Sequence, residues 1–127
     1  MIQEEAPKIY GLEKINRDLP IYLVEGPFDS TFVTNSVALC GSDGDIRCLE
    51  GSSIVFVYDN EPRNREIVNR ISKCISRGES VVIWPSGIIE KDINDMVLSG
   101  HSVMDVIKSN TYSGLEAKIK FNNWKKI

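Results

Sequence analysis

The sequence predicts an α/β protein in which a central four-stranded parallel sheet carries helices on both faces. Short apolar runs at Ile21–Val24, Ile54–Tyr58 and Val81–Trp84 are typical of strands buried on both sides. These runs alternate with segments of helical periodicity, and such alternation favours parallel strands joined by helical crossovers. We therefore expect parallel strands near residues 21–25, 37–40, 54–58 and 81–84.

Size and composition indicate one domain of ordinary globular type. The chain has 127 residues, of which 42% are hydrophobic and 26% charged. Its net charge of -3 argues against tight, non-specific binding of nucleic acid by this chain alone. No apolar run is long enough to cross a membrane, and there is no signal peptide, so we expect a cytoplasmic setting.

The cysteines do not indicate a metal site. Cys40, Cys48 and Cys74 are an odd number without C-x-x-C spacing, so neither a zinc site nor a disulfide framework is expected. Cys40 and Cys74 fall on apolar positions and are interpreted as core residues.

The first strand ends in a carboxylate. Glu25 follows the apolar run, Gly26 and Pro27 turn the chain, and Asp29 begins a segment that can cap a helix over residues 29–35. Open α/β sheets bind ligands in the crevice beyond the carboxyl ends of their strands, where Glu25 is expected. Taken alone, Glu25 can equally be a solvated residue at a strand end.

Two later strands also end in acids. Asp59-Asn60-Glu61 follows the run 54–58, and Lys91-Asp92-Ile93-Asn94-Asp95 follows the run 81–84 after a short turn. Parallel strands deliver these acids to the same edge of one sheet. Unpaired carboxylates repel one another, so gathering them costs stability unless a cation lies among them. Carboxylate oxygens suit Mg²⁺ or Mn²⁺.

This ordered set resembles the Toprim domain, which primases, topoisomerases and some nucleases share. The matching elements are E-G-x-x-D at Glu25, D-x-[DE] at Asp59, and K-D-x-N-[DE] at Lys91. The resemblance covers roughly residues 20–100 and is strongest to the Toprim domain of phage DNA primases. It implies a lead-in segment over residues 1–20 and a Rossmann-like Toprim catalytic domain over residues 21–127.

The resemblance also implies an activity, which is metal-dependent nucleotidyl transfer that makes RNA primers for DNA replication. Asp59, Glu61 and Asp92 would hold the cations, and Glu25 would be catalytic, as a further ligand or as the group that handles the proton. The motif positions with a supporting role would be Gly26, Asp29, Asn94 and Asp95. Many family members have Asp-x-Asp where this chain has Asp59-Asn60-Glu61, so Glu61, one methylene longer, would bind metal differently or through water.

The implied partners are a single-stranded DNA template, ribonucleotides, and a replicative helicase or other primase domains. The setting would be the cytoplasm of a bacterial host. Arg63 and Lys91 are candidate phosphate-binding residues, because cationic side chains near a helix N-terminus match phosphate oxygens. The alternative for Arg63 and Arg65 is a solvated helix face.

Several helices can be placed from periodicity and caps. A helix after Glu61, with Pro62 in its first position, has an apolar face at Ile67, Val68, Ile71, Cys74 and Ile75 and stops at Gly78. A short helix runs from Asp92 to Leu98, and another follows Ser102 to about Ser109. A last helix begins at Thr111 or Ser113, continues through Phe121 and docks through Leu115, Ile119 and Phe121. His101 is interpreted as a turn residue and Trp84 as a packing residue.

Two other functions stay open at this point. A nuclease of the Toprim type would use the same acids to break bonds, and a non-catalytic module would keep the fold and bind a partner. A primase also needs a zinc-binding domain and a basic platform for its template, and neither is found in these 127 residues. We therefore expect a catalytic subdomain or part of a larger primase.

Overall fold

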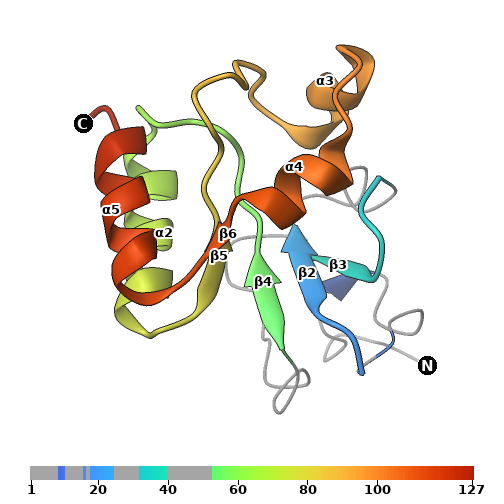
Figure 1. The fold of residues 1–127 in the computed structure, drawn as a ribbon, viewed down its shortest axis with the longest axis horizontal. Coiled ribbons are helices and arrows are strands. Elements are labelled where there is room, and N and C mark those ends of the chain that lie inside the picture. The colour runs from blue at the N-terminus through green and yellow to red at the C-terminus, as the bar shows by residue number, and fades with distance from the viewer. Residues whose placement is uncertain (1–8, 11–15, 17, 25–31, 40–52) are drawn as a thin grey trace, which may run out of the picture.

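The computed structural model of the chain describes residues 9–10, 16, 18–24, 32–39 and 53–127. These residues form an α/β fold in which helices cover both faces of one sheet (Figure 1). The elements are β1 (Ile9–Tyr10), β2 (Ile21–Val24), β3 (Ser36–Leu39), β4 (Ile54–Phe56), α2 (Arg65–Ser76), β5 (Ser80–Val82), α3 (Ile93–Leu98), α4 (Val103–Ser109), β6 (Thr111–Tyr112) and α5 (Gly114–Trp124).

The sheet has the strand order β1-β3-β2-β4-β5-β6. Its four inner strands are parallel, which confirms the four strands expected from the sequence. Short antiparallel strands close both edges, with β1 paired to β3 and β6 paired to β5. Strand β6 was not predicted, because Thr111 was expected to begin a helix. The arrangement is Rossmann-like and consistent with a Toprim fold.

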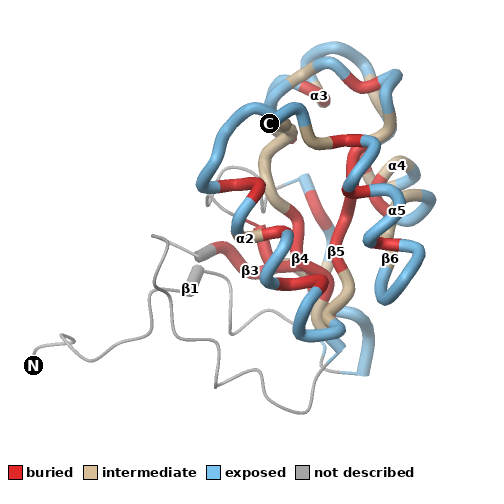
Figure 2. The backbone as a smooth tube through the Cα atoms, turned by 90° about the vertical axis from the view of Figure 1, so that its left-hand side faces the viewer, coloured by how far each residue is buried: buried red, intermediate tan, exposed pale blue. Residues whose placement is uncertain are grey.

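Side chains of the inner strands alternate between two cores. Ile21, Leu23 and Phe56 pack with α2 and α5 on one face of the sheet. Tyr22 and Val55 belong to the second core, which packs against α3 and α4. Period-two alternation of apolar residues on both faces is expected of strands covered on both sides. Figure 2 shows the buried strands between exposed helical surfaces.

Helix α2 begins later than predicted. Asn64 is the N-cap, and its side-chain Oδ1 accepts a hydrogen bond from the backbone N–H of Ile67 at 3.1 Å. Pro62 therefore lies in the turn before the helix, because an asparagine cap two residues further on sets the start. The apolar face is confirmed in full, and Gly78 adopts a φ of 76° just beyond the last turn, a conformation that favours glycine.

Helix α5 begins after Ser113, as one of the two expected starts, and its predicted docking residues are confirmed in part. Leu115 and Ile119 are 73% and 54% exposed, so their predicted docking role is wrong. Phe121 is buried as expected, together with Ala117 and Trp124. Their spacing of four and three residues makes one helical stripe, with the small Ala117 allowing close approach to the layer below.

The helix expected over residues 29–35 is not found in its described part. Residues 32–35 form a turn in which Asn35 has a φ of 50°. The amide of Asn35 donates to the backbone carbonyl oxygen of Pro20 at 2.8 Å, which fastens the turn to the start of β2. Asparagine tolerates this left-handed conformation and uses its side chain to close such turns. The short helices α3 and α4 are confirmed.

Candidate functional site

The segments that follow β4 and β5 gather at the carboxyl-terminal edge of the sheet. In Figure 1 the arrows of β2 and β4 point toward this edge, where the end of α5 also lies. The backbone N–H of Val57 donates to the carbonyl oxygen of Leu23 at 2.8 Å, so hydrogen bonding to β2 continues one residue past the end of β4. The residues after Val57 then leave the sheet and carry the acids Asp59 and Glu61.

Asn60 joins the two acidic segments. Its backbone N–H donates to the carbonyl oxygen of Lys91 at 2.6 Å. Its side-chain amide donates to the carbonyl oxygens of Ile88 at 2.9 Å and Glu90 at 3.0 Å. The segment with Asp59 and Glu61 is therefore fixed against the segment with Lys91 and Asp92. This contact confirms that the second and third sequence motifs lie side by side.

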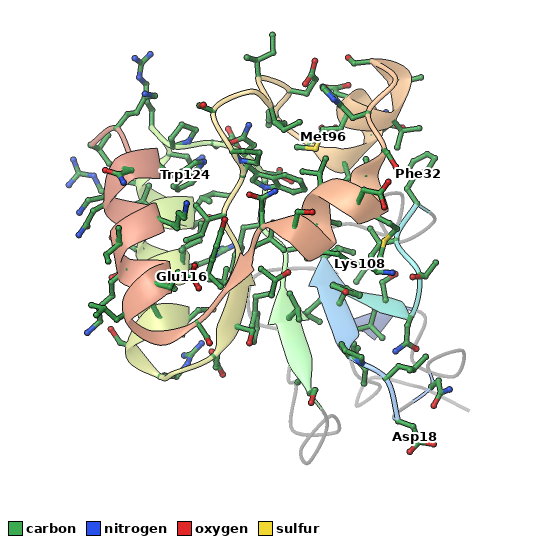
Figure 3. All side chains as sticks on the ribbon, viewed as in Figure 1. Asp18, Phe32, Met96, Lys108, Glu116 and Trp124 are labelled. Atoms are coloured by element: carbon green, nitrogen blue, oxygen red, sulfur yellow. The ribbon has the colours of Figure 1, made fainter. Side chains whose placement is uncertain are left out.

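Both tryptophans of the chain donate hydrogen bonds that support this contact between the two acidic segments. The Trp84 Nε1–H donates to the carbonyl oxygen of Tyr58 at 2.8 Å, and the Trp124 Nε1–H donates to Asn60 Oδ1 at 2.9 Å. Trp84 is 3% exposed, which confirms its interpretation as a packing residue. Figure 3 shows Trp124 at the carboxyl-terminal end of α5. Helix α5 thus takes part in holding the acidic segments.

Asp59 and Glu61 lie in a tight turn before α2. The backbone N–H of Glu61 donates to the carbonyl oxygen of Asp59 at 2.9 Å, and that of Asn64 donates to Glu61 at 3.0 Å. Both acids are half-buried. They precede the N-terminus of a twelve-residue helix, whose positive end stabilises negative charge nearby.

Asp92 is the N-cap of α3. One carboxylate oxygen accepts a hydrogen bond from the backbone N–H of Asp95 at 2.8 Å, which leaves its other oxygen for a further partner. Asn94 and Asp95 are exposed residues in the first turn of the same helix. The K-D-x-N-D motif therefore builds a helix cap. This structural role explains the residue types of the motif without the site hypothesis.

The predicted metal ligands are only partly described. Glu25, Gly26 and Asp29 lie outside the described residues. Within the described ranges, no three His, Cys, Asp or Glu side chains are grouped closely enough to hold a metal ion. The structure brings the segments of Asp59, Glu61 and Asp92 together, and the metal site stays a prediction.

A cationic hollow of about 380 Å³ opens beside these acids. It is lined by Glu61, Pro62, Arg63, Asn64, Lys91 and Lys126. The two candidate phosphate-binding residues, Arg63 and Lys91, thus face one space. Lys126 joins them because its backbone N–H donates to the carbonyl oxygen of Pro62 at 2.8 Å.

A larger hollow of about 560 Å³ adjoins the first, and Pro62 and Lys126 line both. Its wall includes Trp84, Trp124 and Tyr112. Lys120 lies over the Tyr112 ring, with its Nζ 5.4 Å from the ring centre. The larger hollow therefore lies between α5 and the residues that follow β5.

His101 has a partner that the sequence did not predict. His101 lies in the turn between α3 and α4, and its Nε2 is 2.8 Å from Oε1 of Glu90, which precedes α3. The pKa of Glu90 lies below its ordinary value, first because the carboxylate accepts a hydrogen bond from its own backbone N–H. Hydrogen bonds from Ser99 and His101 lower it further, while partial burial opposes the shift. The interaction ties the segment before Lys91 to the helical layer.

Sequence reasoning missed Asn60 and Lys126 as site residues. Asn60 was the variable position inside D-x-[DE], and Lys126 was not among the candidate residues. Asn60 and Trp124 are 64 residues apart in sequence, so no local pattern marks their contact. An asparagine between two acids was the one available signal, because an amide can bridge backbone groups that an acid cannot.

The fold and the acidic strand ends define a Rossmann-like α/β domain with motif-bearing segments at the carboxyl edge of its sheet. The chain is 36% identical to the DNA primase of Enterobacteria phage T4 over 129 aligned positions. The match covers 97% of this chain and spans 37% of that primase. No model of a protein family matches the chain.

Among the helices of the described residues, none is long and apolar enough to cross a membrane.

Proposed function

We propose that this chain is the metal-dependent nucleotidyl-transfer domain of a phage-type DNA primase. The observation that carries the proposal is the 36% identity to a phage DNA primase along 97% of the chain. The contacts of Asn60 support it, because they bring two of the three acidic motifs to one place beside a cationic hollow. The three motifs and their order resemble those of the Toprim domain.

The donor chemistry fits a hard cation. Asp59, Glu61 and Asp92 would offer carboxylate oxygens to Mg²⁺ or Mn²⁺, which would neutralise phosphate charge and activate a hydroxyl nucleophile. Glu25 is proposed to take the proton of the attacking hydroxyl or to complete the ligand set. The capping bond of Asp92 orients its carboxylate, since a capped side chain has few rotamers open to it.

The remaining residues position the substrate. Arg63 and Lys91 are proposed to bind the phosphates of the incoming ribonucleotide, because both line the cationic hollow next to Glu61. Binding there would place the triphosphate beside the acids. Template DNA and any helicase partner belong to the same proposal and are implied for a primase as a whole.

Metal binding can be tested by melting curves. Saturating Mg²⁺ or Mn²⁺ is expected to raise the melting temperature, because a ligand that binds only the folded state stabilises it. Asp59→Asn should remove most of that rise, whereas Asp105→Asn, the same charge change in α4, should retain it. An undiminished rise in Asp59→Asn would place the metal elsewhere.

Catalysis needs a separate test in a preparation that makes primers. Glu25→Gln keeps the side-chain shape and removes the charge. Primer synthesis should fall by orders of magnitude, while the melting temperature stays the same or rises as a repulsive acid is lost. Near-normal synthesis would contradict the role of Glu25. Metal-dependent cleavage of DNA without synthesis would identify a nuclease, and neither activity would identify a binding module.

A further inference from the structure

The cationic hollow carries an excess of positive charge, because Arg63, Lys91 and Lys126 line it and Glu61 is the one acid among its lining residues. Arg63, Lys91 and Lys126 are exposed, and none forms an ion pair with another residue of the described ranges. This local excess stands out because the chain as a whole carries a net charge of -3. Three cations around a hollow of about 380 Å³ suit a ligand with several negative oxygens.

Lys126 is held in place by its surroundings. Its backbone is fixed to Pro62, and two residues earlier the Trp124 indole is bonded to Asn60. The start of the Lys126 side chain is therefore preorganised relative to the Asp59–Asn64 turn, although the side chain itself is exposed. Preorganisation lowers the entropy that a binding residue loses when its ligand arrives.

The larger hollow has a different chemical character. No Asp or Glu is among the residues that line it, and its walls include the apolar side chains of Ile83 and Ile88. Asn123 adds an exposed amide that has no hydrogen bond to the other described residues. Its volume of about 560 Å³ falls within the range of small-molecule pockets. Apolar walls with a free amide suit a flat heterocycle with polar edges.

We propose that the two hollows form one nucleotide site, with the base in the larger hollow and the phosphates in the cationic hollow. The hollows meet at Pro62 and Lys126, so a single molecule can extend from one into the other. Lys126 is then a third phosphate-binding residue, and Asn123 contacts the base. The inference rests on the proposed function for its choice of a nucleotide as ligand.

The phosphate half is tested with two probes, ATP and inorganic tripolyphosphate, titrated by calorimetry with excess Mg²⁺. Lys126→Ala should weaken the binding of both by about five- to tenfold, because each loses one charged contact. Lys118→Ala removes the same charge from an exposed position of α5 that lines neither hollow, and it should bind both probes as the unmodified chain does. Equal affinities for Lys126→Ala and Lys118→Ala would overturn the role of Lys126.

The base half is tested by comparing the probes within one variant. Asn123→Leu should weaken ATP several-fold and leave tripolyphosphate unchanged, because only the base reaches the larger hollow. Unchanged ATP binding, or an equal loss for both probes, would overturn the placement of the base. These titrations do not depend on catalysis. Failed primer synthesis with the remaining primase segments supplied, together with the expected binding pattern, would therefore reject the proposed function and retain the nucleotide site.

Discussion

Asn60 is the residue on which most of the site geometry depends. Its side chain uses both amide hydrogens and its oxygen, on partners from the segment before Asp92 and from α5. Aspartate has the same shape but cannot donate, and alanine makes none of these bonds. The identity of this side chain therefore decides whether the two acidic segments stay together.

Asn60→Ala is expected to lower the free energy of unfolding by about 2–4 kcal/mol, because three hydrogen bonds are lost and the Trp124 N–H is left without its partner. Urea unfolding followed by circular dichroism measures this change. Asn122→Ala, at an exposed position of α5, is the control and should change stability by no more than about 0.5 kcal/mol. Equal stability of the two variants would mean that the hydrogen bonds of Asn60 contribute little to the stability of the fold.

Cys74 should make stability fall in alkaline solution. Burial raises the pKa of this thiol from its ordinary value of 9.0 to about 11, although a hydrogen bond with Tyr58 lowers it in part. Between these values the unfolded chain releases a proton that the folded chain retains, so stability present below pH 9 is lost as the pH rises toward 11. The loss should reach about 2–3 kcal/mol.

The measurement compares free energies of unfolding at pH 8 and pH 10.5 in the unmodified chain and in Cys74→Ala. The variant should show a smaller decline, because it lacks the buried thiol. The same slope in both proteins would show that the buried thiol does not cause the decline.

The positions of the candidate residues could be predicted from sequence only where the residues directly follow a strand. Asp59 and Glu61 follow an apolar run directly, so their place at the carboxyl edge followed from the parallel sheet. Lys126 could not be found in this way, because its place depends on α5 docking and on a bond to Pro62. Long-range contacts of this kind leave no periodic signal in the sequence.

At the scale of elements, the apolar stripe predicted the buried face of α2 in full, although the helix begins at a different cap from the one expected. The docking face of α5 was predicted correctly only at Phe121, because the large apolar residues Leu115 and Ile119 were also taken as anchors. The structure buries the small Ala117 and leaves Leu115 exposed. A small residue in the stripe permits close contact, a feature that hydrophobicity alone does not reveal.

The docking face of α5 gives a matched pair of substitutions. Phe121→Ala removes a buried ring that packs with Trp124 and should destabilise the protein by about 3–5 kcal/mol. Leu115→Ala removes an exposed side chain of the same helix and should cost at most about 0.5 kcal/mol. Thermal or urea unfolding distinguishes them. A larger loss of stability for Leu115→Ala would support the docking of Leu115 that was expected from the sequence.

At the scale of the whole molecule, the proposal predicts that this chain alone binds metal yet makes few primers. Template binding depends on several phosphate contacts from Lys or Arg, and the chain has a net charge of -3. Arg63 and Lys126 line one hollow. That hollow is the size of a small ligand and provides no extended track for a strand.

The test is template-directed synthesis with Mn²⁺ and ribonucleotides, with and without the remaining segments of a phage primase supplied in trans. Synthesis should depend on those segments. Efficient, template-dependent synthesis by the 127-residue chain alone would show that it has its own template site.

The placement of the two indoles also makes the protein its own optical reporter. Trp84 and Trp124 are the chain's complete set of tryptophans, and both line the larger hollow. Emission excited at wavelengths that only tryptophan absorbs therefore comes from the wall of the proposed base site. A ligand that enters this space changes the polarity around the emitting rings, so an unlabelled sample should show occupancy as a shift in its fluorescence spectrum.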